Sequence, residues 1–247
     1  GAADVVLAPG TLTLESTGTT ANTGDIVVTS ANTLNVGTIT FNNSAAQALT
    51  LTTTGNGSDL RLNGAITNGA LVTATVSASG NTTNDVVFNS SMTAKSWQID
   101  ATGNVTAVTG VTVATADNAN GDSGALNVGS SGTLIGGNLE LQGTAKLLTG
   151  TAAKTDAAAT SGAVSVYATG DIKGAGSIET GVATVTDTAL NASSNPATTG
   201  SITLKGAEIS ENGTLAFDVK IATPVAAAGT GAADVVLAPG TLTLEST

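Results

Sequence analysis

The stretch GAVSVYATGDIKGAGSIETG, residues 162–181, sets out a pattern that recurs along the chain. Apolar and polar residues alternate at AVSV, a polar corner follows, a second apolar stretch centres on Ile172, and a third comes after a Gly-rich corner. Alternation over short runs that are rich in β-branched side chains and bounded by Gly, Asn, Asp and Ser is typical of β-strands. The stretch therefore predicts three short strands joined by two tight corners.

The same order of elements returns in GSITLKGAEISENGTLAFDV, residues 200–219, where the second strand centres on Ile209. The remaining alternating runs are DVVLA (4–8), TLTLES (11–16), DIVVTS (25–30), TLNVGTITF (33–41), ALTLTTT (48–54), DLRL (59–62), DVVFNS (85–90) and NLELQG (138–143). Helical spacing is weak even in TAKLLTGTAAKTDAAAT (144–160), which is rich in Thr and interrupted by Gly150, so we expect a loop or insertion there. The chain is predicted to be all-β.

The first strong apolar residue of each group recurs at a nearly regular step, which is mostly about 20 residues and so lies at the short end of solenoid repeats. These residues are Val5, Ile26, Leu49, Leu71, Val86, Val105, Leu126, Val164, Val182, Ile202 and Val235. Three short strands and three turns in each step match one coil of a parallel β-solenoid, or β-helix, whose coils stack about 4.8 Å apart. We therefore predict about 11–12 coils in a 230-residue repeat, which would form a rod of roughly 50–60 Å. The longer steps after Leu126 and Ile202 leave room for an extra coil or a protruding loop.

Small side chains fit this prediction, because a narrow interior enclosed by short sheets holds Val, Ile, Leu, Ala and Thr but few aromatic rings. The main alternative is a string of antiparallel β-sandwich domains of the immunoglobulin type, which usually pack around a buried aromatic residue. Because the chain has one Trp and one Tyr, the solenoid is the favoured fold.

Seventeen residues, GAADVVLAPGTLTLEST, occur twice, at 1–17 and at 231–247. An identity of this length predicts one complete tandem repeat at 1–230 and the start of the next at 231–247. A designed overlap, or a duplicated segment that swaps between subunits, would give the same pattern. We expect the returning segment to stack on the coil that begins at Ile202, whereas a flexible hinge at 224–229 would give beads on a string. The candidate inward residues are Val5, Leu7, Leu12 and Leu14, with Pro9 and Gly10 as the corner.

The composition argues against several classes of function. His and Cys are absent, so the usual general base, the thiol nucleophile and the commonest transition-metal ligands are missing. Seven basic residues against eighteen acidic ones, with no basic cluster, disfavour nucleic acids and anionic membranes as partners. No apolar run approaches the roughly 18 residues of a membrane span, and the first residues lack the pattern of a signal peptide.

The segment DNANGDSG, residues 117–124, has the composition of a calcium loop but not its spacing. The third position counted from Asp117 is Ala119, and the sixth counted from Asn118 is Ser123. We predict a polar turn and no metal or cofactor site, although acidic loops can bind Ca²⁺ loosely.

Carboxylates that a glycan hydrolase or lyase would need are scattered, and Arg61 is the only arginine, so we predict no catalytic residues and no enzyme activity. The carboxylates considered are Asp85, Asp100, Asp171, Asp187, Glu208, Glu211 and Asp218. Trp97 and Tyr167 are far apart in the sequence, which weakens a glycan-binding groove.

Two further patterns are interpreted as surface features. The Asn-x-Ser/Thr triplets are interpreted as solvent-facing corners, and they begin at Asn42, Asn56, Asn81, Asn89, Asn104, Asn191 and Asn212. The pairs Thr11/Thr13, Thr38/Thr40 and Thr50/Thr52 are irregularly spaced, which favours ordinary outward-facing strand threonines over the aligned ladder of an ice-binding solenoid.

Three stretches share one order of residues: Gly-x-apolar-x-apolar, a polar corner, an Ile, and Gly-x-Leu. They are GALNVGSSGTLIGGNLELQG, GDIKGAGSIETG and GSITLKGAEISENGTLAFDVKI. This pattern resembles the filamentous-haemagglutinin class of bacterial surface proteins. The resemblance implies a long right-handed β-helix, export by two-partner secretion, and a use in adhesion or biofilm cohesion.

We therefore expect a structural repeat of a very long, secreted bacterial cell-surface protein, which forms a stalk or fibre and contacts identical repeats of the same chain. The alternative is a subunit of a laterally assembled filament, sheath or S-layer-like structure, and a carbohydrate-binding β-helix is the third hypothesis. Lateral assembly predicts an apolar or calcium-rich flank, whereas glycan binding predicts Trp or Tyr gathered in a groove.

Overall fold

The computed structural model describes residues 12–17, 24–42, 45–187, 195–210, 218–221, 227–228, 237–238 and 240–246. Strands dominate these residues, and the helical element among them is a short 3₁₀ turn, η1 (Gly69–Leu71). Every pairing between two named strands is parallel. The all-β prediction is confirmed, and the antiparallel sandwich is wrong.

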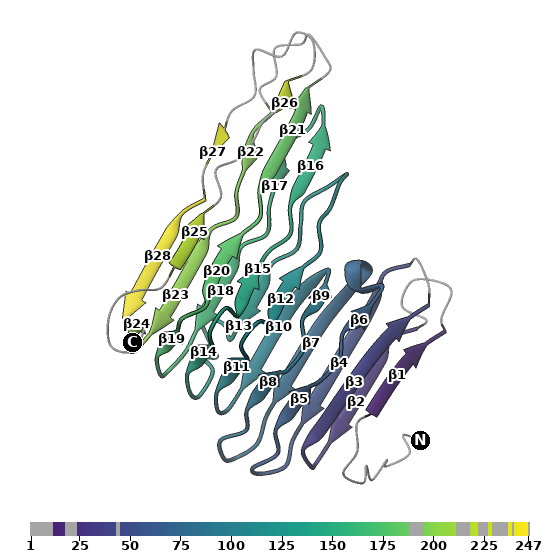
Figure 1. Cartoon of the computed structure of the whole chain (residues 1–247), viewed down its shortest axis with the longest axis vertical. Coiled ribbons are helices and arrows are strands. Elements are labelled where there is room, and N and C mark those ends of the chain that lie inside the picture. Colours follow the sequence, from purple (N-terminus) through teal and green to yellow (C-terminus); the bar gives the residue numbers. More distant parts are fainter. Residues whose placement is uncertain are drawn as a thin grey trace.

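Three main sheets run through the molecule (Figure 1). Sheet A contains, in spatial order, β1 (Leu12–Ser16), β3 (Leu34–Phe41), β5 (Leu60–Leu62), β8 (Val86–Phe88), β11 (Val105–Ala107), β14 (Leu139–Leu141), β19 (Ile172–Gly174) and β24 (Ile209–Ser210), and β6 (Ile66–Thr67) also pairs with β3. Sheet B contains β2 (Ile26–Ser30), β4 (Gln47–Thr53), β7 (Val72–Ala78), β10 (Ser96–Ala101), β13 (Leu126–Val128), β18 (Val164–Tyr167), β23 (Ile202–Gly206) and β28 (Leu242–Ser246). Sheet C contains β9 (Met92–Ala94), β12 (Thr112–Thr115), β15 (Lys146–Leu148), β20 (Ser177–Thr180) and β25 (Asp218–Ile221).

Two smaller sheets form an arm that extends from the later part of the chain, at the top of Figure 1. The first arm sheet contains β16 (Ala152–Thr155), β21 (Ala183–Asp187) and β26 (Ala227–Ala228), and the second contains β17 (Ala159–Thr160), β22 (Ala197–Thr198) and β27 (Leu237–Ala238). The loop predicted at 144–160 is wrong, because β15, β16 and β17 lie within it, but β16 and β17 do belong to additional sheets that the earlier described passes of the chain lack. The buried core of the arm is made of small side chains, which lets its sheets pack closely together. They are Ala152, Ala159, Ala183, Val185 and Ala197.

From β9 onward, each pass of the chain visits a strand of sheet B, then one of sheet A, then one of sheet C, before the next strand of sheet B. The predicted strands within 162–181 are confirmed as β18, β19 and β20, and those within 200–219 correspond to β23, β24 and β25. Each strand pairs with the strand that occupies the same place one pass later.

The passes are longer and fewer than the sequence spacing predicted. In sheet B, the aligned inward positions are Ile26, Leu49, Ala74, Trp97, Leu126, Val164, Ile202 and Leu242. Hydrogen-bonded residues on neighbouring passes are 23 positions apart at Asp25 and Ala48, and 40 positions apart at Ser201 and Thr241. The aligned inward positions are joined by seven steps, so the predicted 11–12 coils are too many for this part of the chain.

The sequence spacing misled because it mixed positions from different sheets. Val86 and Val105 are aligned on neighbouring strands of sheet A and do not belong to sheet B. Leu71 belongs to η1 and is 38% exposed, and the neighbouring Val72 is the buried residue that opens β7. Val182 is half-buried just before β21, at the start of the arm.

The main core lies between sheets A, B and C and is built from apolar side chains of all three. At two places in this core a large aromatic side chain is aligned with an alanine on a neighbouring strand. Trp97 is aligned with Ala74 in sheet B, and Phe88 is aligned with Ala107 in sheet A. Phe88 and Trp97 meet edge to face, with ring centroids 5.7 Å apart. Because an alanine lies beside each large ring, the core accepts the ring without spreading the strands.

Glycine is required where successive passes enter sheet B. The residues before the strands read Ser123-Gly124, Ser161-Gly162, Thr199-Gly200 and, in the repeated segment, Pro239-Gly240. A Cβ atom on Gly162, Gly200 or Gly240 would overlap the carbonyl oxygen of the glycine one pass earlier. We call Gly124, Gly162, Gly200 and Gly240 the glycine column.

The returning segment stacks where it was expected. Strand β28 pairs with β23 in unbroken parallel register from Ile202↔Leu242 to Gly206↔Ser246. The identical residues Leu12–Ser16 lie instead in sheet A as β1, where Leu12 and Leu14 are half-buried against the core. Val5, Leu7, Pro9, Gly10 and Val235 lie outside the described residues, as does most of the range 224–229 where a hinge was considered.

Replacing Gly162 with Ala should lower the free energy of unfolding by at least about 2 kcal/mol, because the new methyl group would collide with the backbone of the previous pass. Gly132→Ala is the matched control, since a Cβ there meets nothing within 4 Å. Urea unfolding followed by circular dichroism measures both variants. Equal stabilities would contradict the role of the glycine column.

Candidate functional site

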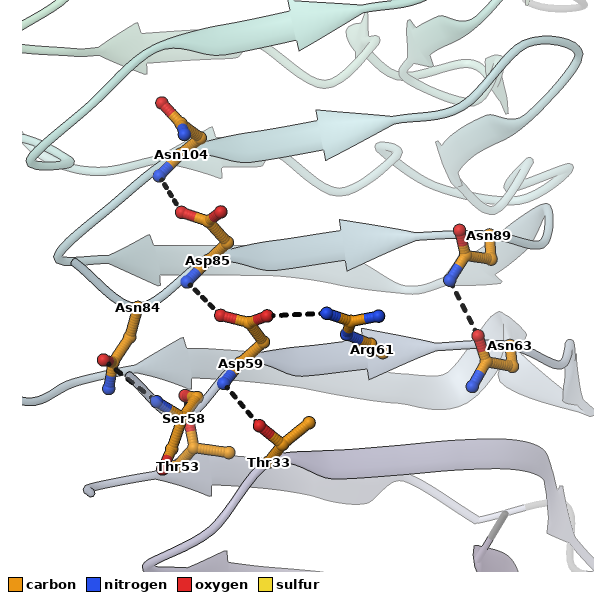
Figure 2. Close-up of polar contacts among 10 residues, drawn as sticks. All are labelled: Thr33, Thr53, Ser58, Asp59, Arg61, Asn63, Asn84, Asp85, Asn89 and Asn104. Carbon is orange, nitrogen blue, oxygen red and sulfur yellow. Dashed lines mark hydrogen bonds and ion pairs between the residues drawn. The ribbon is translucent and has the colours of Figure 1, made fainter. Parts of the chain in front are cut away.

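A ladder of polar side chains follows the entrance to sheet A (Figure 2). The residue directly before each sheet A strand from β3 to β19, apart from β6, is Thr, Asp or Asn. These residues, which we call the Asx ladder, are Thr33, Asp59, Asp85, Asn104, Asn138 and Asp171. In Figure 2 the first four lie one above another at the same end of consecutive strands.

From Thr33 to Asn138, a side-chain oxygen of each member of the Asx ladder accepts a hydrogen bond from the backbone N–H of the next member. The bond from Asn104 N to Asp85 Oδ1 is 2.7 Å long, and that from Asn138 N to Asn104 Oδ1 is 2.8 Å long. Asp171 N donates to Asn138 Oδ1 at 2.7 Å. The ladder supplies acceptors for backbone N–H groups at the corners, and it joins each pass to the next.

A second ladder accompanies the glycine column. The hydroxyl oxygens of Ser123, Ser161 and Thr199 accept hydrogen bonds from the glycine N–H groups one pass later, over 2.7, 2.8 and 2.6 Å. Where the chain leaves sheet C, the hydroxyl oxygens of Thr115 and Thr149 accept hydrogen bonds from the backbone N–H groups of Gly150 and Gly181, respectively. The three polar series therefore stand at three different corners of the passes.

Ion pairs also join neighbouring passes. In four pairs, a lysine meets a carboxylate on the pass before or after it: Lys146–Glu179, Lys154–Asp122, Lys173–Glu140 and Lys205–Glu245, with N–O distances of 2.7 to 3.7 Å. All are partly exposed, so each contributes little to the free energy of folding. Their effect is to place opposite charges next to each other on neighbouring passes along the outer surface.

The loop 117–124, weighed as a calcium loop, holds the arm. Asp117 Oδ1 accepts hydrogen bonds from the backbone N–H and the hydroxyl of Thr151. Asp122 binds Lys154 Nζ at 2.7 Å and the N–H of Thr160 at 2.7 Å. The hydrogen bond from Lys154, with help from Thr160, lowers the pKa of the Asp122 carboxyl despite its partial burial. Within the described ranges, no three acidic side chains converge as a metal-binding group.

The carboxylates considered from the sequence have separate positions. Asp85 and Asp171 belong to the Asx ladder, and Asp100 Oδ1 accepts a hydrogen bond from Gln98. Glu208 is exposed, and its carbonyl oxygen accepts the N–H of Ile172. Asp187 lies in β21 and Asp218 in β25, but the side chains of these two residues are not among those that the structure describes. Glu211 lies outside the described residues. Arg61 pairs with Asp59 across 2.9 Å, as Figure 2 shows.

The aromatic candidates for glycan binding do not gather in a groove. Trp97 is 1% exposed and donates its indole N–H to the carbonyl of Ala114 at 2.7 Å. Tyr167 is half-buried at the end of β18. Trp97 is therefore a core residue and is closed to a sugar ring.

The threonine pairs are outward-facing where the structure describes them, and in sheet B Thr50 belongs to a longer polar column. In sheet B the aligned outward positions after Val27 are Thr50, Thr75, Gln98, Asn127, Ser165, Thr203 and Thr243. None of these side chains is charged, so an uncharged polar strip, one residue wide, follows sheet B, and the outward positions beside it include Asp100, Lys205 and Glu245. Among the triplet asparagines, Asn42, Asn56, Asn81 and Asn89 are exposed, whereas Asn104 is half-buried in the Asx ladder.

A cavity of about 420 Å³ lies where the chain leaves sheet C. It is lined by three stacked corners, 114–117, 148–151 and 179–182, together with Thr93. Its carboxylates are engaged in bonds between passes: Asp117 with Thr151, and Glu179 with Lys146. The buried hydroxyl of Thr180 has no hydrogen-bond partner within the described part of the chain.

Sequence reasoning missed the Asx ladder, although a signal was present. Five of its members open the pattern Asp/Asn-apolar-x-apolar or its shortened form, at 59, 85, 104, 138 and 171. The strands were recognised from this pattern, but the polar residue before them was taken as an ordinary corner.

Comparisons with family models, with curated proteins and with solved structures found no match for the chain. No helix in the described segments is long and apolar enough to cross a membrane.

Replacing Asp85 with Ala should cost about 1–2 kcal/mol of folding free energy, because the N–H of Asn104 loses its acceptor. Asp85→Asn keeps an Oδ1 acceptor and should retain most of that energy. Urea unfolding curves for both variants test the ladder. If Asn and Ala replacements cost the same, charge and not the hydrogen bond would be responsible, and this account of the ladder would fail.

Proposed function

We propose that the passes are the coils of a parallel β-solenoid and that the chain is a structural repeat of a giant extracellular bacterial surface protein. The repeat would form part of a rod-like stalk or fibre that projects from the cell. The observation that carries this proposal is the pairing of β28 with β23, because residues identical to the first strand of the chain extend sheet B by one further strand. Although the identical residues Leu12–Ser16 lie in sheet A, the docking of the returning segment on the preceding pass would let the stack continue along one axis.

The ladders support a load-bearing role. Backbone hydrogen bonds, side-chain acceptors and ion pairs all join one pass to the next, so force along the stack is shared among many contacts. With seven steps between Ile26 and Leu242, the rise over these residues is about 34 Å at about 4.8 Å per strand, so the proposed rod is shorter and thicker per repeat than the sequence spacing implied.

The resemblance to the filamentous-haemagglutinin class remains part of the proposal. It would make the solenoid right-handed, the protein secreted, and the rod a device for adhesion or biofilm cohesion. The net charge of −11 supports a rod that stays dispersed outside the cell. We propose no catalytic activity and no resident cofactor, with weak calcium binding at acidic loops as the only ion contact.

A second candidate is lateral assembly into a sheath, filament or S-layer-like array. The uncharged polar strip of sheet B is the observation that bears on it, because the strip itself offers no charge repulsion, but it is not the apolar or calcium-rich flank that lateral assembly predicts. Carbohydrate binding is less favoured, because Trp97 is buried.

Electron micrographs of the intact surface protein distinguish these functions. Isolated rods with a distal head, lengthening by about 35–40 Å for each repeat, are expected for the stalk. Bundles or sheets of rods would contradict the stalk and support lateral assembly. Globular particles joined by flexible linkers would contradict both.

A further inference from the structure

The last described strand of the chain occupies a specific docking site on the edge of β23. Besides the five-residue register, Ile202 N donates to Thr241 O at 2.8 Å, and Gly240 N donates to Thr199 Oγ1 at 2.6 Å. Thr241 N donates to Ser201 Oγ at 3.2 Å, and Lys205 pairs with Glu245 at 3.7 Å. We call this the seam site. It recognises backbone, hydroxyl and charge together.

The seam site also selects for shape. The Cβ of any residue other than glycine at position 240 would overlap the carbonyl oxygen of Gly200. The site therefore requires glycine two positions before the strand; the strand that docks there has Leu at its first and third positions, 43% and 52% exposed, and an acid at its fourth. Residues 1–17 supply the same order, with Gly10 before Leu12, Leu14 and Glu15.

The amino-terminal copy is held less regularly than the carboxyl-terminal one. Strand β1 pairs with β3 in sheet A, and the register shifts between Leu12 and Leu14. Glu15 binds the side chain of Asn42, where Glu245 meets a lysine. The same five residues therefore have two alternative partners in one fold, and the match at the seam site is the unbroken one.

We propose that Leu12–Ser16 of a second copy of this chain, with the residues before them, take the place of Leu242–Ser246 at the seam site. The exchange adds a parallel strand to an open sheet edge, which is a recurrent mode of peptide recognition. Because the donor strand and the acceptor strand β23 are different parts of the molecule, the contact is heterologous, or head-to-tail, and can continue from copy to copy. This inference holds whether the rods serve as stalks or as sheaths, since it depends only on the seam site.

The chain's own segment competes with the incoming one. Residues 231–247 are covalently attached, so their effective concentration at the seam site is about millimolar. Exchange therefore becomes visible when the attached segment cannot dock. Gly240→Val meets that condition, because its side chain collides with Gly200. Thr243→Pro meets it by a second route, since a proline in the middle of β28 removes a backbone donor from the register in which Thr243 is aligned with Thr203.

The probe is a fluorescent peptide with the sequence GAADVVLAPGTLTLEST, added to the full 247-residue chain and followed by fluorescence anisotropy. It should bind the Gly240→Val and Thr243→Pro chains in a 1:1 ratio, at least tenfold more tightly than the wild-type chain. Thr243→Val is the matched control, because its side chain is on the outward face and the attached strand should remain docked. The peptide with Gly10→Val should not bind any of them.

Sedimentation of the chain without peptide gives the second readout. Gly240→Val should form head-to-tail oligomers as its concentration rises, whereas the double variant Gly10→Val with Gly240→Val should stay monomeric. Circular dichroism verifies that the variants are folded. The proposal is overturned if neither vacated chain binds the peptide, if the wild-type chain binds it equally well, or if the single and double variants form the same oligomers.

Discussion

Backbone atoms of successive passes approach one another so closely at the entrance to sheet B that a Cβ atom does not fit between them. Gly162, Gly200 and Gly240 each lie against the glycine one pass earlier. Each also donates its backbone N–H to the hydroxyl oxygen of the Ser or Thr that comes directly before that earlier glycine. Fixed in this way, the corner determines where the next strand of sheet B begins. The register of the sheet then determines which side chains face the core.

The lengths of the passes are free to vary because the corners fix only their own positions. The short pass that joins β2 to β4 and the much longer one that joins β23 to β28 enter sheet B at equivalent places, and the arm accommodates the additional residues of the later passes. The arm has its own core of alanines and valine, so it does not disturb the column of larger residues beside it. A stack can therefore grow wider along its length while its sheets remain continuous.

The sequence predicted the strands well where apolar alternation was uninterrupted, as at 164–167 and 202–206. It failed at 144–160, because alanine and threonine carry little periodic signal and the strands there depend on packing between passes. It also failed on the number of passes, since Val86 and Leu126 look alike in the sequence although they belong to different sheets. Periodicity reports which residues are buried but not which sheet buries them.

The polar residues were harder to interpret than the apolar ones. Asp85 and Asp122 were weighed as parts of acidic sites, yet each accepts backbone hydrogen bonds from a neighbouring pass. That partner lies 19 residues away for Asp85 and 38 for Asp122, so no local pattern identifies it. The identity between 1–17 and 231–247 was more informative, because it predicted the docking of the returning segment on the pass that contains Ile202.

Paired spin labels measure the stacking of passes directly, and the absence of cysteine from the chain allows labels at chosen positions. Labels at Asn127 and Ser165, which are aligned on neighbouring strands, should show strong dipolar broadening, because their Cα atoms should lie about 4.8 Å apart. Labels at Asn127 and Thr203, two strands apart, should show less. Spectra of the first pair that equal the sum of the single-label spectra would contradict the parallel stacking on which the account depends.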